Sequence, residues 1–338
     1  MAKVLIISAP FFDYQVSVGR AFRKLGYDVH IETYDEPIHP FKGMLKWRHK
    51  FSPRKEQLRQ ASRLKYKQYI EKVFSEYKPD IVFIYNGTIL LDSTLDFFRE
   101  HGAKVLLWMY DSVQRPDRAM CVSHIDHVDV FCCFEQTDVE FYQRQGKTAY
   151  FLPLACDTDV YYPIANQEKD IDILFVGTIY TSPKRIKVLE QVAEHYKGKK
   201  VLFYGHYKPF YKNPLTWLCR KYRDVFLNVN LPPKEVNELF SRTKIALNVH
   251  HSQTFNGANQ RLFEACGAGA YQVCDSNPFI ESIFSNSEVG LYNSMDELYE
   301  RIDYALSHDM SAQAQAAYKI ITENHTFIQR VEQMLSYL

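Results

Sequence analysis

Residues 244–275 read KIALNVHHSQTFNGANQRLFEACGAGAYQVCD, which is the pattern of a strand, a polar loop, a short helix and a second strand. The apolar run IALNV predicts a buried strand, and residues 258–266 predict the helix. Four side chains fall at i, i+3, i+4 and i+7 and so share one helix face: Asn259, Leu262, Phe263 and Cys266. Gly267 and Gly269 suit a left-handed turn that ends a helix. The segment therefore predicts a strand–helix–strand unit of an α/β protein.

The start of this predicted helix is rich in polar groups. It carries amide and small side chains with backbone N–H groups, which favour an anion at a helix N-terminus: Asn256, Gly257, Ala258 and Asn259. Arg261 and Glu264 follow three residues apart, so their side chains are neighbours. This set suits a nucleoside diphosphate, with Arg261 and N–H groups for the phosphates and Glu264 for the ribose hydroxyls. A surface ion pair on a buried helix explains Arg261 and Glu264 equally well.

The chain resembles the CgeB-like glycosyltransferases, relatives of glycosyltransferase family four. The resemblance begins with the run N-x-R-x-F-E-x-x-x-x-G, which consists of Asn259, Arg261, Phe263, Glu264 and Gly269. Residues 152–162 (LPLACDTDVYY) are similar to the family's interdomain segment, and residues 173–178 (ILFVGT) to the first strand of its second domain. The tail HTFIQR at 325–330 resembles the family's ending. The likeness extends from Lys104 to the C-terminus.

The resemblance implies the GT-B architecture, an α/β fold with two Rossmann-like domains that face a central cleft. It predicts an N-terminal acceptor domain over residues 1–165 and a nucleotide-sugar donor domain over 166–317. A C-terminal helix over 318–338 is expected to cross back to the first domain. The implied activity is metal-independent transfer of a sugar, with retention, from a nucleotide-diphosphate donor to a glycan, lipid-linked or protein acceptor. The resemblance points to cell-surface polysaccharide synthesis, with a UDP-sugar as substrate and no cofactor.

Further donor contacts are expected at the ends of strands in the second domain. The candidates are Gly177, Thr178, Lys184, Arg185, His206 and Leu231. A glycine at a strand end with a cation soon after suits a diphosphate, and the resemblance places the base near Leu231. A solvated Lys-Arg helix start and an exposed loop histidine explain the same residues without a ligand.

The strand predicted over residues 104–110 ends beside Asp111, where the crevice of an open α/β sheet lies. Family four commonly has His-Asp here, whereas this chain has Tyr110 and Asp111. The resemblance makes Asp111, Arg261 and Glu264 the candidate catalytic residues. Asn256 stands where family four has the first of two glutamates, so a donor contact there is neutral. The first strand–helix turn lacks G-x-G-x-x-G, which is consistent with a donor site in the second domain.

Composition restricts the class of protein. Lys and Arg total 41 against 40 Asp and Glu, and this net charge of +1 argues against a dedicated nucleic-acid binder. Seven cysteines without a C-x-x-C pair predict buried, reduced thiols in a cytosolic protein. The N-terminus does not have the pattern of a signal peptide, and no apolar run approaches the ~20 residues of a membrane span. A cytoplasmic protein is expected.

Two basic stretches contain interleaved aromatic residues, at 42–72 and 208–223. This pattern predicts peripheral contact with an anionic membrane, although solvated helices are the commoner source of such charge runs. Four further residues resemble metal ligands: His124, Asp126, His127 and Asp129. Their spacing straddles a helix end and a strand, where caps and turn residues are expected instead. No metal site is predicted.

Two other functions fit the same architecture. One is a nucleotide-sugar 2-epimerase, which would turn over UDP-N-acetylglucosamine without an acceptor. The other is a non-catalytic, glycosyltransferase-like subunit, which would bind a donor without hydrolysing it.

Overall fold

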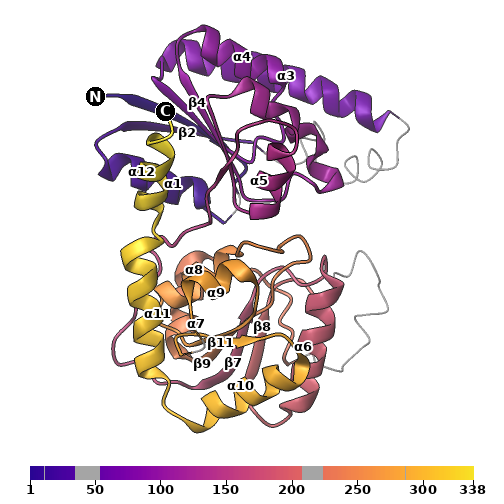
Figure 1. Cartoon of the computed structure of the whole chain (residues 1–338), viewed down its shortest axis with the longest axis vertical. Helices are drawn as coiled ribbons and strands as arrows, with labels where there is room; N and C mark the ends of the chain where they lie inside the picture. The colour runs from indigo at the N-terminus through magenta and orange to yellow at the C-terminus, as the bar shows by residue number, and fades with distance from the viewer. Residues whose placement is uncertain (11, 35–53, 208–223, 286) are drawn as a thin grey trace. The chain divides into compact units, whose positions relative to one another are not determined.

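The computed structural model describes residues 1–10, 12–34, 54–207, 224–285 and 287–338. Within them the chain forms two α/β units, Met1–Pro153 with Phe327–Leu338, and Leu154–Thr326 (Figure 1). Each unit has one parallel sheet, so the predicted two-domain α/β fold is confirmed. The expected boundary at residue 165 lies beyond the observed one, and the chain returns to the first unit at Phe327 rather than at residue 318.

The first unit contains a parallel sheet of six strands in the described residues. Its order is β2 (Asp28–Thr33), β1 (Lys3–Ser8), β3 (Ile81–Tyr85), β4 (Lys104–Met109), β5 (Val130–Cys133) and β6 (Tyr150–Phe151). Strand β3 is buried along its whole length, and in β1 and β4 only the first residue is not. Such continuous apolar runs are typical of a parallel sheet with both faces covered.

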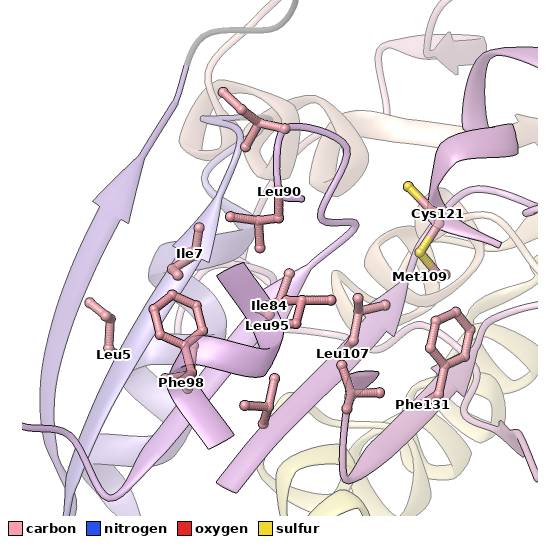
Figure 2. Packing of buried hydrophobic residues seen from close by; sticks show 14 of the residues in the cluster. Leu5, Ile7, Ile84, Leu90, Leu95, Phe98, Leu107, Met109, Cys121 and Phe131 are labelled. Carbon is pink, nitrogen blue, oxygen red and sulfur yellow. The ribbon is translucent and has the colours of Figure 1, made fainter. Parts of the chain in front are cut away.

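Helices cover both faces of this sheet. They are α1 (Tyr14–Lys24), α3 (Lys55–Tyr77), α4 (Asp92–Glu100), α5 (Gln136–Gln143) and α12 (Phe327–Leu335), with the 3₁₀ helices η1 (Pro116–Cys121) and η2 (Ser123–His127). Figure 2 shows alternate strand residues such as Leu5, Ile84 and Leu107 packing with Leu95 and Phe98 of α4. On the other face, the ring centroids of Trp108 and Phe327 are 6.1 Å apart. The returning helix α12 is therefore part of the core of the first unit.

The second unit contains a parallel sheet of five strands in the described residues. Its order is β11 (Gly290–Tyr292), β10 (Gln272–Asp275), β9 (Thr243–Asn248), β7 (Ile171–Val176) and β8 (Val201–Tyr204). The helices are α6 (Pro183–His195), α7 (Pro233–Arg242), α8 (Gln260–Gly267), α9 (Pro278–Ile283), α10 (Met295–Ser307) and α11 (Ser311–Asn324). Residues of α6 and α10 join one core cluster with β7, β8 and β9. The strand–helix–strand unit predicted from residues 244–275 is present as β9, α8 and β10.

Two glycines at the end of α8 have different roles. Gly269 has a φ of 72°, so it adopts the left-handed conformation that the sequence predicts there. Gly267 is still helical, and a Cβ at this position would lie 2.2 Å from the Cys156 sulfur. The absence of a side chain at Gly267 therefore lets α8 pack directly against the segment around Cys156.

The described cysteines are all buried and free of disulfides, as the sequence predicts. Cys219 lies outside the described residues. Within the described parts of the chain, no helix is both long and apolar enough to cross a membrane. The predicted basic stretch at 208–223 and residues 42–53 of the other stretch also lie outside the described residues.

Candidate functional site

The carboxyl edge of the second sheet gathers the polar groups that the sequence singles out. Strand β9 leads into the loop at 250–258, and α6, α8 and α9 begin after β7, this loop and β10 respectively. Ligands bind in open α/β sheets outside the carboxyl ends of the strands, where helix N-termini attract anions. The Asn277 side chain at the start of α9 donates a hydrogen bond of 2.9 Å to the Gly257 carbonyl, which connects the loop to α9.

The N-terminus of α8 is capped by its own side chain. Asn259 is the N-cap, and its Oδ1 accepts a hydrogen bond from the Leu262 N–H at 3.1 Å. The Asn259 and Asn248 amides exchange hydrogen bonds of 2.7 and 3.1 Å, and Asn248 donates another of 2.9 Å to Gln272. Asn259 therefore attaches the helix start to β9 directly and to β10 through Asn248, and one of the N–H groups expected to face an anion is already satisfied.

Arg261 and Glu264 form an ion pair inside the second unit. The Arg261 Nη1 donates to the Glu264 Oε2 and, at 3.3 Å, to the Tyr161 hydroxyl. Only 14% of the Arg261 side chain and 1% of the Glu264 side chain are exposed. Burial raises the pKa of Glu264, and the Arg261 charge opposes this rise. The pair exists as the i,i+3 spacing predicts, but it is buried rather than on the surface.

Glu264 nevertheless has one unused oxygen. Its Oε1 is buried and has no hydrogen-bond partner among the described residues. An unsatisfied carboxylate oxygen is costly in a buried position. A ligand hydroxyl could supply this partner only if it reached a side chain that is fully covered in this structure.

The segment that resembles the family's interdomain motif packs against α8. Gln260 donates from its Nε2 to the Ala155 carbonyl, and Tyr161 supplies the hydroxyl that Arg261 contacts. Burial raises the pKa of Tyr161, so this phenol stays neutral. The sequence analysis did not identify Tyr161 as a site residue, because only the fold brings it to Arg261.

A second ion pair lies at the carboxyl edge of the same sheet, between Lys184 and Asp275. The Lys184 Nζ is 2.6 Å from the Asp275 Oδ2. The Asp275 Oδ1 accepts from the His250 backbone N–H at 2.8 Å and lies 2.7 Å from the His250 Nδ1. Burial alone would raise the pKa of Asp275, but His250 and Lys184 outweigh it and hold the pKa below its usual range. Lys184 was a predicted donor contact, whereas Asp275 and His250 were not predicted.

Arg185 connects two parts of this edge. Its Nε donates to the Val249 carbonyl at 2.7 Å and its Nη1 to the Thr178 carbonyl at 2.8 Å. Burial lowers its pKa to about 10, so the guanidinium is charged at neutral pH. Arg185 therefore adds a buried positive charge to this edge of the sheet, and its hydrogen bonds are made to backbone carbonyls.

The group His250, Cys274 and Asp275 is the one in the described residues that has metal-ligand atoms close together, within 4.8 Å of one another. Burial raises the pKa of the Cys274 thiol well above its usual range, which disfavours the thiolate that binds metals. Lys184 also occupies an oxygen of Asp275. The arrangement therefore fits a hydrogen-bonded network better than a metal site.

Other acidic and histidine residues that could suggest a metal have separate partners. His124 contacts Asp92 at 2.7 Å, and Asp126 contacts Lys147. His127 lies beside Asp96, and Asp129 accepts from the Val105 N–H. The chain also contains two D-x-D sequences, at 170–172 and at 157–159. In the first, Asp170 pairs with Arg242 and Asp172 pairs with Lys244. In the second, Asp157 accepts a hydrogen bond from the Asp159 N–H.

The remaining predicted donor residues lie in loops of the second unit. Gly177 follows β7, and its N–H donates to the Tyr204 carbonyl at 2.9 Å. A Cβ at Gly205, whose φ is 130°, would lie 1.8 Å from the Gly177 oxygen. The backbone segments that follow β7 and β8 therefore approach each other closely. His206 is exposed after β8, and Leu231 is half-buried before α7. Among the described residues, no hydrogen bond or ion pair connects His206 or Leu231 to the Lys184–Asp275 pair.

Asp111 belongs to the first unit, where two arginines hold it. Arg115 donates to Oδ1 at 3.0 Å, and Arg118 donates to Oδ2 at 2.7 and 3.1 Å. Both arginines also contact Asp117. Asp111 lies at the carboxyl end of β4, as predicted, but its environment is that of an ion-pair network.

Comparisons with known proteins agree with this fold. Residues 185–336 match a family model described as glycosyl transferase-like. A search of curated protein sequences gives no match. The sucrose-phosphate synthase of Thermosynechococcus elongatus superposes with a TM-score of 0.72 at 12% identity, covering 99% of this chain and 98% of that one.

Two further structures contain nucleotides. Anabaena HepE in complex with UDP and glucose has a TM-score of 0.67 at 11% identity, with 100% of both chains covered. The Escherichia coli trehalose-6-phosphate protein bound with UDP-2-fluoro glucose has a TM-score of 0.65 at 12% identity, covering 99% of this chain and 98% of that one. These similarities confirm the predicted GT-B fold class.

Proposed function

We propose that this chain, a glycosyltransferase enzyme of the GT-B fold, transfers a sugar from a UDP-sugar bound at the carboxyl edge of its second sheet. The acceptor is a glycan, a lipid-linked sugar or a protein in cell-surface polysaccharide synthesis, as the CgeB-like resemblance implies. The same resemblance favours retention at the transferred sugar. UDP is the nucleotide of choice because two proteins of similar fold were solved with UDP or a UDP-sugar.

The main observation in favour of a donor site at this edge is its excess of positive charge. Lys184, Arg185 and Arg261 face two carboxylates, Asp275 and Glu264. The N-termini of α6 and α8 add partial positive charge there. This region lies almost entirely within the residues that match the family model. A diphosphate group would balance the excess charge.

We assign separate roles to the two ion pairs, Lys184–Asp275 and Arg261–Glu264. Lys184 contacts the donor diphosphate, because its side chain is half-exposed. Arg261, whose side chain is 14% exposed, is the second cation for the diphosphate, and Glu264 holds Arg261 in place. Fixed cations stabilise the negative charge that develops on the leaving diphosphate, which lowers the barrier without a bound metal.

Asp111 acts in the first unit through the arginines that it holds. Arg115 and Arg118 together contact both of its oxygens, so the carboxylate orients two guanidinium groups at the end of β4. We assign this cluster to acceptor binding. Alanine in place of Asp111 should then raise the KM for the acceptor and leave UDP affinity unchanged.

A nucleotide-binding panel tests the donor assignment. The protein is titrated with UDP, GDP, TDP and CMP while its melting temperature is followed, and the UDP complex is measured by calorimetry. UDP at a hundred times its dissociation constant should stabilise the protein by about 2.7 kcal/mol. If none of the four nucleotides binds, the donor site is not at this sheet edge.

Turnover assays then separate the enzyme classes. A transferase incubated with a UDP-sugar alone should release UDP slowly by hydrolysis. Conversion of UDP-N-acetylglucosamine to its epimer without an acceptor would instead identify an epimerase. Binding without any release of UDP would identify a binding subunit.

Peripheral membrane contact concerns the part of the chain around α3. In the described residues of this helix, several cations pair with glutamates, as Arg59 does with Glu56 and Lys67 with Glu71. Tyr69 and Leu64 are exposed beside them. Flotation with anionic liposomes at low salt tests this contact, and protein that stays in the soluble fraction would contradict it.

A further inference from the structure

The two oxygens of Asp275 have different partners. The Oδ2 lies 2.6 Å from the Lys184 ammonium, and the Oδ1 receives both the backbone N–H and the ring Nδ1–H of His250. Asp275 is 7% exposed and His250 is 1% exposed, whereas the Lys184 side chain is 49% exposed. The buried His250 therefore fixes the Asp275 carboxylate, and this carboxylate holds a lysine whose side chain is half-exposed.

We propose that Asp275, supported by His250, is a positioning residue that holds the Lys184 ammonium in place for the donor diphosphate. This inference rests on the proposed function, because it takes the diphosphate to bind at Lys184. It adds two residues that the family resemblance and the sequence pattern do not assign.

Lysine needs such a support more than arginine does. Its ammonium group sits on a flexible four-carbon chain, and a ligand that must first immobilise this chain binds less tightly. An ammonium group has three donors, so the bond to Asp275 leaves others for phosphate oxygens. The structure thus holds the cation near the carboxyl ends of β7 and β10 before a ligand arrives.

His250 keeps Asp275 from turning away. Because its Nδ1–H and backbone N–H both point to one oxygen, rotation of the carboxylate would break two hydrogen bonds. The ring position is fixed in turn by the backbone, since Arg185 holds the carbonyl of the preceding residue, Val249. The His250 Nε2 is buried and has no hydrogen-bond partner among the described residues, so the ring's polar contacts, with Asp275 and the Cys274 sulfur, are made by Nδ1.

A purely structural role is the competing explanation. The Lys184–Asp275 pair joins α6 to β10 across 91 residues of sequence and could simply fasten the helix to the sheet. The two explanations differ in what they predict for a ligand without phosphates. A positioning role affects UDP and spares uridine, whereas a loosened fold affects both.

The experiment measures UDP and uridine affinities by calorimetry for the wild type and for Lys184→Met, Asp275→Asn and His250→Gln. Lys184→Met and Asp275→Asn should each weaken UDP binding by roughly tenfold to a hundredfold and leave uridine affinity unchanged. His250→Gln should have a smaller effect of the same kind. In the Lys184→Met background, Asp275→Asn should cost no further UDP affinity, because the two residues act through one contact.

A matched control is available at the opposite edge of the same sheet. Asp172 and Lys244 form a similar pair at 2.7 Å, at the amino ends of β7 and β9. Asp172→Asn should leave both affinities unchanged. If Asp275→Asn fails to fold, Asp275→Glu replaces it, since the longer side chain keeps the charge but displaces the ammonium group.

Several outcomes would overturn the inference. Equal losses of UDP and uridine affinity in Asp275→Asn would show a structural role. A loss of UDP affinity by Asp275→Asn that persists in the Lys184→Met background would show that Asp275 does not act through Lys184. Unchanged UDP binding in Lys184→Met would remove the premise for this residue while the nucleotide panel still supports a donor site. Failure of the wild type to bind any nucleotide would instead refute the proposed function.

Discussion

The two ion pairs at the edge of the second sheet contain the same kinds of charge in different surroundings. Arg261 and Glu264 lie on one helix, and 14% and 1% of their side chains are exposed. Lys184 and Asp275 join a helix to a strand, and their exposures are 49% and 10%. The inner pair is mostly buried, whereas the outer pair has a half-exposed lysine. Exposure of the cation therefore predicts whether a substitution acts mainly on folding or mainly on ligand binding.

The difference in exposure between the two pairs determines how much stability is lost when one partner is removed. Removing one partner of a buried pair leaves an uncompensated charge and costs about 3–5 kcal/mol. Water screens the half-exposed Lys184, and the buried Asp275 keeps its hydrogen bonds from His250 when Lys184 is removed. Loss of that ammonium should therefore have a smaller effect on stability. Substitutions in the inner pair should thus act first on folding, and substitutions in the outer pair on ligand binding.

The largest expected effect is that of Arg261→Met. It leaves the Glu264 carboxylate buried without its cation, and the melting temperature should fall by roughly 6–20 °C. Adding Glu264→Gln should recover part of this loss, because the unpaired charge is then absent. Thermal melts of the single and double variants measure both effects. A double variant that is less stable than Arg261→Met would contradict the buried-charge explanation.

The pH dependence of this variant sharpens the test. Burial raises the pKa of Glu264, and without Arg261 the pKa rises further. A carboxyl group with a raised pKa in the folded state destabilises the protein as the pH rises from its unfolded pKa to its folded pKa, because the unfolded state has released a proton that the folded state still holds. The stability difference between Arg261→Met and the wild type should therefore be larger at pH 8 than at pH 5.5. An equal difference at both values would mean that Glu264 is not the source of the penalty.

The sequence could indicate the inner pair but not the outer one. Arg261 and Glu264 are three residues apart on a helix, so local geometry makes them neighbours. Lys184 and Asp275 are 91 residues apart, and only the pairing of β7, β9 and β10 brings them together. The sequence pattern also could not predict how deeply Arg261 and Glu264 are buried, because their burial depends on the segment around Cys156 and Tyr161 that covers α8.

The strands were easier to predict than the chemistry at their ends. The continuous apolar runs of β4 and β7 identify buried parallel strands without knowledge of their neighbours. Asn259 shows the limit, since its amide suggested a group free for an anion. In the fold, Asn248 engages this amide and is itself held by Gln272, and the Asn259 Oδ1 caps its own helix. Partners from other strands decide whether a polar side chain is free for a ligand.

Glu264→Gln should have the next largest effect. The amide keeps the shape of the side chain and can still accept from Arg261, so the loss of stability should be about 1–3 kcal/mol. UDP affinity should change little if Glu264 only supports Arg261. A loss of tenfold to a hundredfold in both UDP and uridine affinity, with an unchanged melting temperature, would instead show that Glu264 binds the ribose, as roughly one charge-assisted hydrogen bond predicts. Calorimetry beside thermal melts separates the two roles.

Asp275→Asn should lower stability by a similar or smaller amount, about 1–2 kcal/mol, but with a different pH dependence. His250 and Lys184 hold the pKa of Asp275 below its usual range despite burial. An acid with a lowered pKa stabilises the fold above its unfolded pKa, and that contribution is lost only as the pH falls through the folded pKa. The defect of Asp275→Asn should therefore be the same at pH 8 and pH 5.5. A defect that grows between these values, as expected for Arg261→Met, would mean that the two pairs do not differ as described.

Removal of metal ions has the smallest expected effect. A divalent cation at His250, Cys274 and Asp275 would have to displace the Lys184 ammonium and deprotonate a thiol whose pKa burial raises well above its usual range. It would also add positive charge beside Arg185. Because the protein's own cations are assigned to the leaving diphosphate, EDTA should leave turnover unchanged, whereas Lys184→Met should lower it. Loss of turnover in EDTA that Mn²⁺ restores, together with normal turnover of Lys184→Met, would place a metal where the exposed pair is proposed to act.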